Sequence, residues 1–516
     1  MKLKNIIYTT FLVTLSTSCG DFLEPKSQSE YVPKETNALQ EMLIGEAYPV
    51  QKAGHSLLSY LEIFNDDIQQ QVLEGYDFNE NNQSKKEPLG AMFSWQPDIF
   101  TIMEQKGYSI SNVWSGAYEY ILGANAALDY INKVSGTQEE KDYIIAQALA
   151  LRAFYYYLLV NYYGAPYNYD KNALGVPLKL DSGMREESEI LLTRNTVEEV
   201  YKQIIADLNE AERLFLTQPV SKQYQPNYLV SLPMIELLKS RVYLYMENWS
   251  EAKKYANKVI KDWSFSLLDL NSIALPNPGV KEPYYEFSSY KSPEVIWLYG
   301  SIQDFTSQYI DYLSKKNTNN DNRKMFIASE TLLSSFNAGD LRKDLYIVKE
   351  MNVNSKDPTQ STFYDNYLPF GKYKTNNSSP VSGGDSYFAL SFRLSEAYLN
   401  FAEAAALNNA EGEAISAMNT LLEKRYTPET FTAVPNLSGE ALVNFIREER
   451  RKELCYEGQR WFDLRRYGMP AFTHKWEGIT YTLTKNDRSY TMPLSKEIMD
   501  KNKKLDQNPL APKRGN

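Results

Sequence analysis

Cysteine and histidine are scarce in this sequence. Its 516 residues include only two cysteines, Cys19 and Cys455, and two histidines, His55 and His474. Two cysteines cannot build a disulfide framework, and the sequence contains no HExxH, GxSxG or P-loop motif and no GxGxxG after a strand. Most histidine-dependent catalysis is therefore excluded. No cofactor is indicated, and the sequence leaves the question of a bound metal open.

Hydrophobic runs long enough to cross a membrane are also missing. Lys2 and Lys4 precede an apolar run over residues 6–15, which is far shorter than the about 20 residues that a spanning helix needs. A basic start followed by a short apolar run is typical of a signal peptide, predicted here over residues 1–18. The later run YYYLLVNYY is interrupted by polar groups. We therefore expect no anchor helix.

Cys19 follows the apolar run directly. The small residues 16–18 lead into it as in a bacterial lipoprotein signal, which is cleaved before a cysteine that receives acyl chains, although Leu15 lies one position further from the cysteine than usual. We expect a lipid on Cys19 and a flexible tether over residues 19–36. An ordinary signal with an incidental cysteine is the alternative. Cys455 then has no partner and is expected to be a small buried residue.

Positive charge does not dominate any large part of the chain. The formal net charge is −10, which argues against nucleic acid as a partner. The most basic stretch, REERRKELCYEGQRWFDLRRYG at 447–468, alternates acids with bases. A nucleic-acid patch is one interpretation of it, but the spacing favours internal ion pairs. The expected pairs are Glu448 and Glu449 with Lys452, and Arg465 and Arg466 with Glu457 and Asp463.

Amphipathic helices dominate what is present. Residues 113–134 and 139–164 carry apolar residues near a 3.6-residue period and predict a helical hairpin. Thr196, with Glu199 three residues later, predicts a capping box. A third pair is predicted over 233–260, with Ser250 capping its second helix, and a fourth over 395–425.

Small residues recur within the last two pairs. Ser240 and Ala252 are expected where two helices cross, and Ala402 and Ala414 repeat their spacing. This spacing is similar to that of tetratricopeptide repeats, in which hairpins stack to bury faces that none buries alone.

Long irregular segments separate the helices, near 65–110, 264–330 and 350–388. They are rich in Asn, Ser, Pro, Gly and aromatic residues, which predicts loops with a few short strands. Loops of this length usually carry function. We interpret the helices as a scaffold and these segments as the binding surface of one domain over residues 37–516.

Six segments, taken in order, give the chain a specific resemblance. They are SCGDFLEP, ALALRAFYYYLLVNYYGAPY, FNAGDLRKD, FRLSEAYLNFAEA, ERRKELCYEGQRWFDLRRYG and MPLSKEIMDKNKKLDQNPL. Together they resemble the SusD/RagB family of outer-membrane lipoproteins over nearly the whole chain. The resemblance implies a mostly α-helical, SusD-like fold, with tetratricopeptide-like helix pairs supporting an irregular region. It also implies a surface-exposed, lipid-anchored and non-catalytic nutrient-binding protein.

The same resemblance implies a partner and a ligand class. Proteins of this family act as a lid on a TonB-dependent, SusC-like transporter of the outer membrane and capture oligosaccharides or, in some branches, peptides. An oligosaccharide-binding lid is the prediction, and a peptide-binding lid of the same fold is the alternative. A glycoside hydrolase that uses two carboxylates, for which pairs such as Asp66 and Asp67 are available, is the alternative from another class.

Aromatic residues supply the predicted ligand contacts. The chain has 40 tyrosines, more than a core of this size needs, and sugar rings stack on flat aromatic faces. We expect Trp95, Tyr284, Tyr285 and Tyr290, all in the irregular segments, to contact ligand. A peptide would use the same rings with more backbone pairing.

Overall fold

The computed structural model of the chain describes residues 33–49, 57–58, 61–108, 113–183, 191–278, 285–300, 312–316, 321–352, 354, 356–372 and 388–515. The predicted signal peptide, Cys19, His55 and Tyr284 lie outside these residues.

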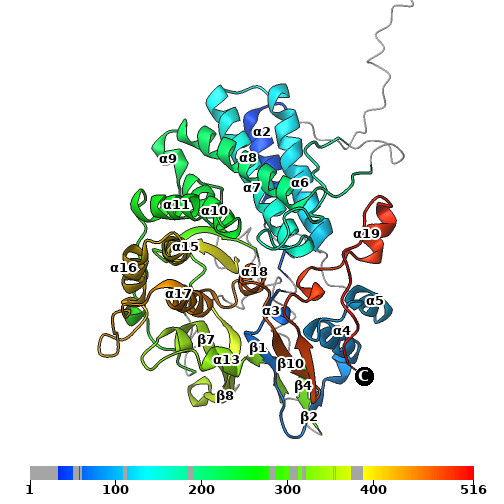
Figure 1. The fold of residues 1–516 in the computed structure, drawn as a ribbon, viewed down its shortest axis with the longest axis vertical. Coiled ribbons are helices and arrows are strands. Elements are labelled where there is room, and N and C mark those ends of the chain that lie inside the picture. The colour runs from blue at the N-terminus through cyan, green and yellow to red at the C-terminus, as the bar shows by residue number, and fades with distance from the viewer. Residues whose placement is uncertain are drawn as a thin grey trace, which may run out of the picture.

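The longer helices form one array in which each packs against the next along the chain (Figure 1). The array begins at α2 at the top of the view and continues down its left side to α16 and α17. Its members are α2 (Thr36–Ala47), α6 (Val113–Tyr130), α7 (Gln138–Tyr163), α8 (Val197–Leu216), α10 (Leu232–Tyr245), α11 (Trp249–Lys261), α15 (Leu394–Leu407), α16 (Glu411–Leu422) and α17 (Gly439–Leu454). This stacking confirms the predicted mostly α-helical fold of packed hairpins.

The helix boundaries follow from local capping. Thr196 accepts from the backbone nitrogen of Glu199, whose side chain returns to the backbone of Thr196, so the predicted capping box is confirmed. The prediction that Ser250 caps α11 is wrong. Asn248 is the cap, because its side-chain oxygen accepts from the nitrogen of Glu251.

The predicted crossing of α10 and α11 is confirmed. Ser240 is fully buried, and its hydroxyl donates to the carbonyl of Ala252 at 2.9 Å. Contact at hydrogen-bond distance requires small side chains on both helices. Ala402 and Ala414 are likewise fully buried on α15 and α16, which pack against each other.

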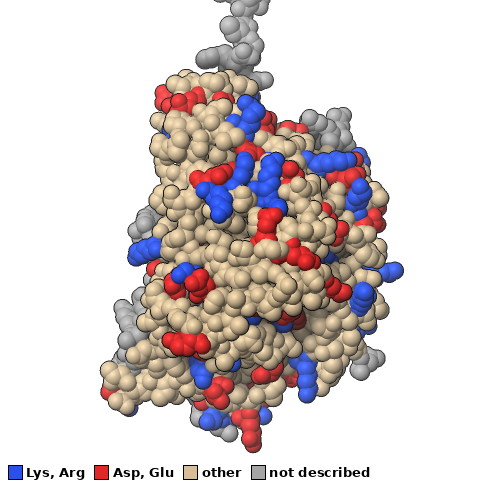
Figure 2. Space-filling view, turned by 60° about the vertical axis from the view of Figure 1, so that its left-hand side comes forward, with Lys and Arg blue, Asp and Glu red and all other residues tan. Residues whose placement is uncertain are grey.

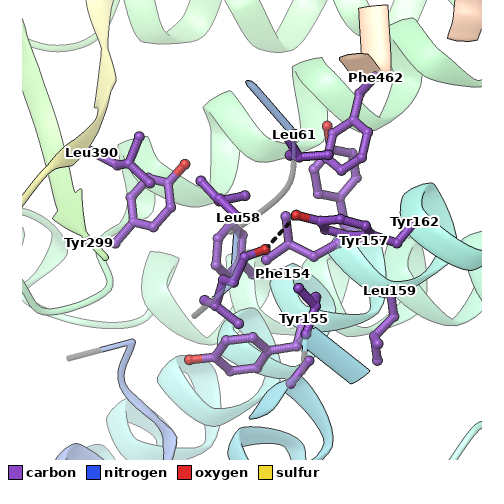
Figure 3. Close-up of a cluster of buried hydrophobic side chains, with 14 of the residues drawn as sticks. Leu58, Leu61, Phe154, Tyr155, Tyr157, Leu159, Tyr162, Tyr299, Leu390 and Phe462 are labelled. Atoms are coloured by element: carbon purple, nitrogen blue, oxygen red, sulfur yellow. Dashed lines mark hydrogen bonds between the residues drawn. The ribbon is translucent and has the colours of Figure 1, made fainter. Parts of the chain in front are cut away.

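Helix α7 is the centre of the core. Its aromatic residues Phe154, Tyr155 and Tyr157 lie among residues from other elements, including Tyr299 and Phe462 (Figure 3). By length and composition, α7 could cross a membrane. This differs from the expectation that no segment after the signal peptide is long and apolar enough to do so. Within the described residues, 89% of its most apolar window is buried inside the protein.

Short helices and strands occupy most of the lower part of the molecule (Figure 1). The short helices are α3 (Leu61–Phe64), α4 (Gln83–Phe93), α5 (Ile99–Gln105), α9 (Val220–Gln223), α13 (Glu330–Leu333), α14 (Arg342–Tyr346), α18 (Arg460–Arg466) and α19 (Lys496–Lys501). Of these, α9 lies apart from the rest, at the upper left of the view and in contact with α8. The strands are β1 (Ile68–Gln70), β2 (Tyr76–Phe78), β3 (Val295–Tyr299), β4 (Leu313–Lys315), β5 (Asn322–Arg323), β6 (Phe326–Ala328), β7 (Ile347–Asn352), β8 (Thr362–Gly371), β9 (Leu390–Arg393), β10 (Phe472–Trp476) and β11 (Ile479–Leu483).

The strands pair antiparallel in small separate sheets. The described residues form the pairs β1–β6, β3–β9, β7–β8 and β10–β11 and one three-stranded sheet in the order β2–β4–β5. In that sheet Phe78 pairs with Leu313 and Ser314 pairs with Asn322. The sheet therefore joins segments that are more than two hundred residues apart in the chain.

Candidate functional site

Trp95 lies just beyond the C-terminal end of α4 and is 2% exposed. Its indole nitrogen donates to the carbonyl of Phe64 at 2.9 Å, and its ring stacks on His474 with 4.3 Å between centroids. The cavity that Trp95 helps to line measures about 20 Å³, which is room for a single water. A ligand would need this region to open before it could stack on Trp95, so that contact stays a prediction.

Tyr285 and Tyr290 are half-buried in the segment before β3. Tyr285 packs edge-on against Phe287, with centroids 4.8 Å apart. The hydroxyl of Tyr290 donates to the carbonyl of Asn227 and accepts from the backbone nitrogen of Leu298. These neighbours differ from those of Trp95. The described contacts therefore do not gather the predicted aromatic residues into one site, and ligand contact at the tyrosines also stays a prediction.

Asp66 and Asp67, the carboxylate pair of the hydrolase alternative, are held by arginines. Arg460 donates to both carboxylate oxygens of Asp66 at 2.8 Å, and Arg451 donates to Asp67 at 2.7 Å. Burial raises the pKa of Asp66, but Arg460 and Arg451 outweigh it and hold that pKa well below its usual range. Asp66, which stays ionised in bidentate contact with Arg460, is therefore a poor general acid. Burial raises the pKa of Asp67, opposed by Arg451.

The basic stretch at 447–468 forms internal ion pairs, as predicted in part. Glu449 pairs with Lys452, and Arg466 pairs with Asp463 at 2.8 Å. Glu448 is exposed, and no ion pair to it is found among the described residues. The Glu448–Lys452 pair is therefore not formed.

The predictions for Arg465 and Glu457 are wrong. Arg465 donates to the backbone carbonyls of Gly164 and Tyr490. Its guanidinium group therefore holds two loops in place and does not form the predicted ion pair. Glu457 pairs with Arg393 and Lys372, both at 2.7 Å. These two partners come from distant parts of the chain, which local spacing cannot indicate.

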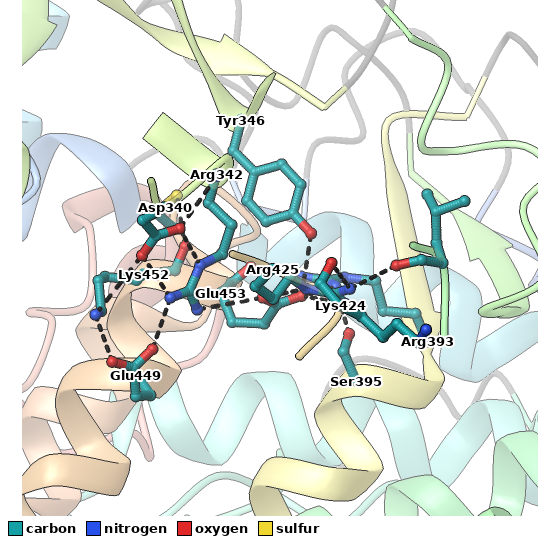
Figure 4. Close-up of polar contacts among 12 residues, drawn as sticks. Asp340, Arg342, Tyr346, Arg393, Ser395, Lys424, Arg425, Glu449, Lys452 and Glu453 are labelled. Atoms are coloured by element: carbon teal, nitrogen blue, oxygen red, sulfur yellow. Dashed lines mark hydrogen bonds and ion pairs between the residues drawn. The ribbon is translucent and has the colours of Figure 1, made fainter. Parts of the chain in front are cut away.

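Glu453 lies at the centre of a buried polar network (Figure 4). Its carboxylate accepts hydrogen bonds from the guanidinium groups of Arg342, Arg393 and Arg425 and from the hydroxyl of Tyr346. Burial raises the pKa of Glu453, but Arg425 and Arg393 outweigh it and hold it well below its usual range. The network joins α14, β9 and α17 and is structural, because its charged groups pair with one another.

A large polar hollow opens beside the β2–β4–β5 sheet, and we call it the amide hollow. Its volume is about 720 Å³. It is lined by Asp77, Phe78, Asn79, Glu80, Asn81, Gln83, Ser314, Lys315, Lys316 and Asn322. In Figure 1 the labels β2 and β4 lie at the bottom of the molecule, at the opposite end from α2.

A chain of hydrogen bonds fixes one wall of the amide hollow. Asn79 donates from its carboxamide to the hydroxyl of Ser314 at 2.8 Å, and that hydroxyl donates to Asn322 at 2.8 Å. Asn79 also accepts from the backbone nitrogen of Asn81, and Gln83 donates to the carbonyl of Phe78. The side-chain amides of Asn79 and Gln83 are therefore oriented before any ligand arrives.

The lysines around the amide hollow are paired with carboxylates. Lys316 lies 3.5 Å from Asp77, and Lys315 lies 3.9 Å from Asp321. Asp321 also accepts the hydroxyl of Tyr76 at 2.6 Å. The hollow thus offers neutral amide and hydroxyl groups, and both of its lysines lie close to carboxylates.

Sequence reasoning missed the amide hollow because its walls come from two separate loops. The segments FNENNQ at 78–83 and SKKNTNNDN at 314–322 are each rich in Asn and Gln. That composition is the signal in the sequence, but Asn and Gln enrichment predicts loops in general and does not indicate that two loops share one site. The pairing of β2 with β4 brings the two segments together.

Other candidate sites are not supported by the described residues. They contain no group of three or more His, Cys, Asp or Glu side chains that could hold a metal ion. On the face shown in Figure 2, acidic and basic side chains are interspersed without a broad basic area. That face offers no surface suited to nucleic acid.

The chain is similar to known proteins along most of its length. Residues 21–244 match a family described as starch-binding and associating with the outer membrane, and residues 307–510 match the SusD family. SusD-like protein P25 of Formosa agariphila is 24% identical over 536 aligned positions, covering 91% of this chain and 90% of the relative. SusD-like protein P2 of the same organism is 26% identical, covering 71% of this chain and 73% of the relative.

Solved structures show the same fold. A SusD superfamily protein from Bacteroides thetaiotaomicron matches with a TM-score of 0.66 at 21% identity, covering 92% of this chain and 100% of that one. A SusD-like carbohydrate-binding protein from Bacteroides vulgatus matches with a TM-score of 0.64 at 22% identity, covering 92% and 97%. Taken with the two matched regions, which leave only the chain ends and a central segment uncovered, these likenesses show that the chain belongs to the SusD/RagB family.

Proposed function

We propose that this protein captures oligosaccharides at the outer-membrane surface and acts as the lid of a TonB-dependent, SusC-like transporter. The observation that carries the proposal is the amide hollow in a chain of this family. Sugar hydroxyls both donate and accept hydrogen bonds, and amide side chains offer both functions. A matched family is described as starch-binding, and one structural relative as carbohydrate-binding, which supports the same ligand class.

Attachment to the membrane is proposed through a lipid on Cys19. The described chain begins at residue 33, beside the start of α2. The intervening residues reach at most roughly 50 Å at about 3.5 Å per residue. The matched family's association with the outer membrane supports this location. A short tether would keep the lid at high effective concentration beside its transporter.

We infer that the protein binds its ligand without cleaving it. Asp66 and Asp67 are occupied by Arg451 and Arg460. The peptide-binding lid differs from the proposal in ligand only, so the same experiment separates the two.

The test uses the full-length lipoprotein purified from its native outer membrane in mild detergent. Titration calorimetry with mixed neutral oligosaccharides should show binding, chromatography should recover them uncleaved, and a β-barrel transporter should co-purify. Binding of a peptide digest in place of the sugars would favour the peptide-binding lid, and shortened sugars would favour the hydrolase. Membrane retention of a Cys19→Ala protein in cells that lack the transporter would contradict the lipid anchor.

A further inference from the structure

We propose that the amide hollow selects uncharged oligosaccharides over those that carry carboxylate or sulfate groups. This inference rests on the proposed function and names the ligand class of the same site. It follows from three features of the described residues, which are the pairing of every lysine in the lining, the unengaged amide groups and an additional carboxylate at the rim.

The first feature is the absence of a spare positive charge among the described lining residues. Lys316 and Lys315 are the lysines of the lining, and each has a carboxylate within 4 Å, at Asp77 and Asp321. An anionic sugar would compete with these carboxylates for the lysines. Binding proteins that select anions instead present cations or backbone N–H groups that are not yet paired.

The second feature is that several amide oxygen and nitrogen atoms of the lining have no hydrogen-bond partner among the described residues. Gln83 uses its nitrogen on the carbonyl of Phe78, and Asn322 uses its oxygen on Ser314. Within the described residues this leaves the oxygen of Gln83, the nitrogen of Asn322 and the whole carboxamide of Asn81 available. The hollow therefore presents both acceptors and donors. A hydroxyl group can use both kinds, whereas an anionic group can use only the donors.

The third feature is Glu80, which is exposed and belongs to the lining. No ion pair of Glu80 is found in the part of the chain that the structure describes. With Asp77 it places two carboxylates in the lining, and an anionic ligand would approach both. Repulsion between like charges at short range opposes that approach.

The experiment compares neutral oligosaccharides with their oxidised counterparts. Short malto-, cello-, manno- and galacto-oligosaccharides are titrated into the full-length protein before and after oxidation of their C6 hydroxyls to carboxylates. We expect at least one neutral series to bind, with affinity independent of salt, and its oxidised form to bind on the order of ten-fold more weakly. Equal or tighter binding of the oxidised form overturns the inference but leaves the proposed function standing. Failure of both forms in every series contradicts both.

Variants assign the selectivity to this hollow. The Asn81→Ala, Asn322→Ala double variant should bind the neutral ligand on the order of ten-fold more weakly, because two amide contacts are lost. Asn444→Ala, at an exposed asparagine on α17, is the matched control and should bind normally. The Asp77→Asn, Glu80→Gln variant frees Lys316 and should gain affinity for the oxidised form. Unchanged affinities in both double variants would place the site elsewhere and overturn the inference.

Discussion

Arg393 binds Glu453 twice, donating to its carboxylate and to its backbone carbonyl. Arg342 and Arg425 share the same carboxylate. In Glu453→Gln all three guanidinium groups stay buried while their shared negative charge is lost, so we expect the free energy of unfolding to fall by about 3–5 kcal/mol. Urea denaturation measures the change.

Glu448→Gln is the control for this substitution. Glu448 lies on the same helix α17 but is exposed, so the change should stay within about 0.5 kcal/mol. A Glu453→Gln protein as stable as this control would show that the network does not depend on the charge of Glu453.

Features fixed by neighbouring residues were the ones that the sequence could predict. The capping box at Thr196 and Glu199 needs only four residues of chain, and the crossing of Ser240 with Ala252 needs only one hairpin. Among the ion pairs, Glu449 with Lys452 was predictable because it spans three residues of one helix.

Features built from distant segments were not predictable. Arg393 and Glu453 lie sixty residues apart, and no local spacing relates them. The amide hollow depends on the pairing of β2 with β4, which joins Asn79 to Ser314 across 235 residues. Composition predicts that both segments are irregular loops. Only the antiparallel register of β2 and β4 shows that the amide side chains of the two segments line the same hollow.

Ser240 provides a test of the helix crossing. Ser240→Leu places a large side chain against the backbone of α11, and we expect it to destabilise the protein by about 1–3 kcal/mol through overpacking. Ser240→Ala loses only one hydrogen bond and should cost about 1 kcal/mol. Thermal unfolding of both variants measures the difference. Ser416→Leu, at an exposed position on α16, is the matched control, and an equal loss there would contradict the proposed cause.

His474 should make the protein less stable in mild acid. Burial lowers its pKa from 6.5 to about 4, opposed by contacts to the carbonyls of Phe93 and Asn65 and by Asp66. As pH falls below 6.5 the unfolded chain binds a proton that the folded chain binds only near pH 4, so stability is lost between these values. The loss amounts to about 3 kcal/mol.

The difference between the wild type and His474→Gln isolates this effect from that of the carboxylates. Urea denaturation at several pH values should give a smaller loss between pH 6.5 and 4 in the variant. Nuclear magnetic resonance of the imidazole should place the midpoint near pH 4 in the folded protein. A midpoint above 6.5 would show that the two carbonyl contacts outweigh burial and would reverse the sign of the prediction.

Trp95 needs a test that separates folding from ligand contact. The ring is 2% exposed, stacks on His474 and donates to Phe64, so Trp95→Ala should lower the free energy of unfolding by about 3–5 kcal/mol. A weaker affinity for oligosaccharide in that variant would therefore say little about direct contact.

Trp95→Phe keeps an aromatic ring in the core and loses mainly the hydrogen bond, so it should remain folded. Its affinity, measured by calorimetry beside that of Tyr285→Ala, decides the matter. Reduced affinity in these folded variants would bring the aromatic residues into the binding surface. Wild-type affinity in Tyr285→Ala, whose half-buried ring can be removed at little cost in packing, would exclude contact of that ring with the ligand. Wild-type affinity in Trp95→Phe would exclude a role for the indole nitrogen of Trp95 in binding.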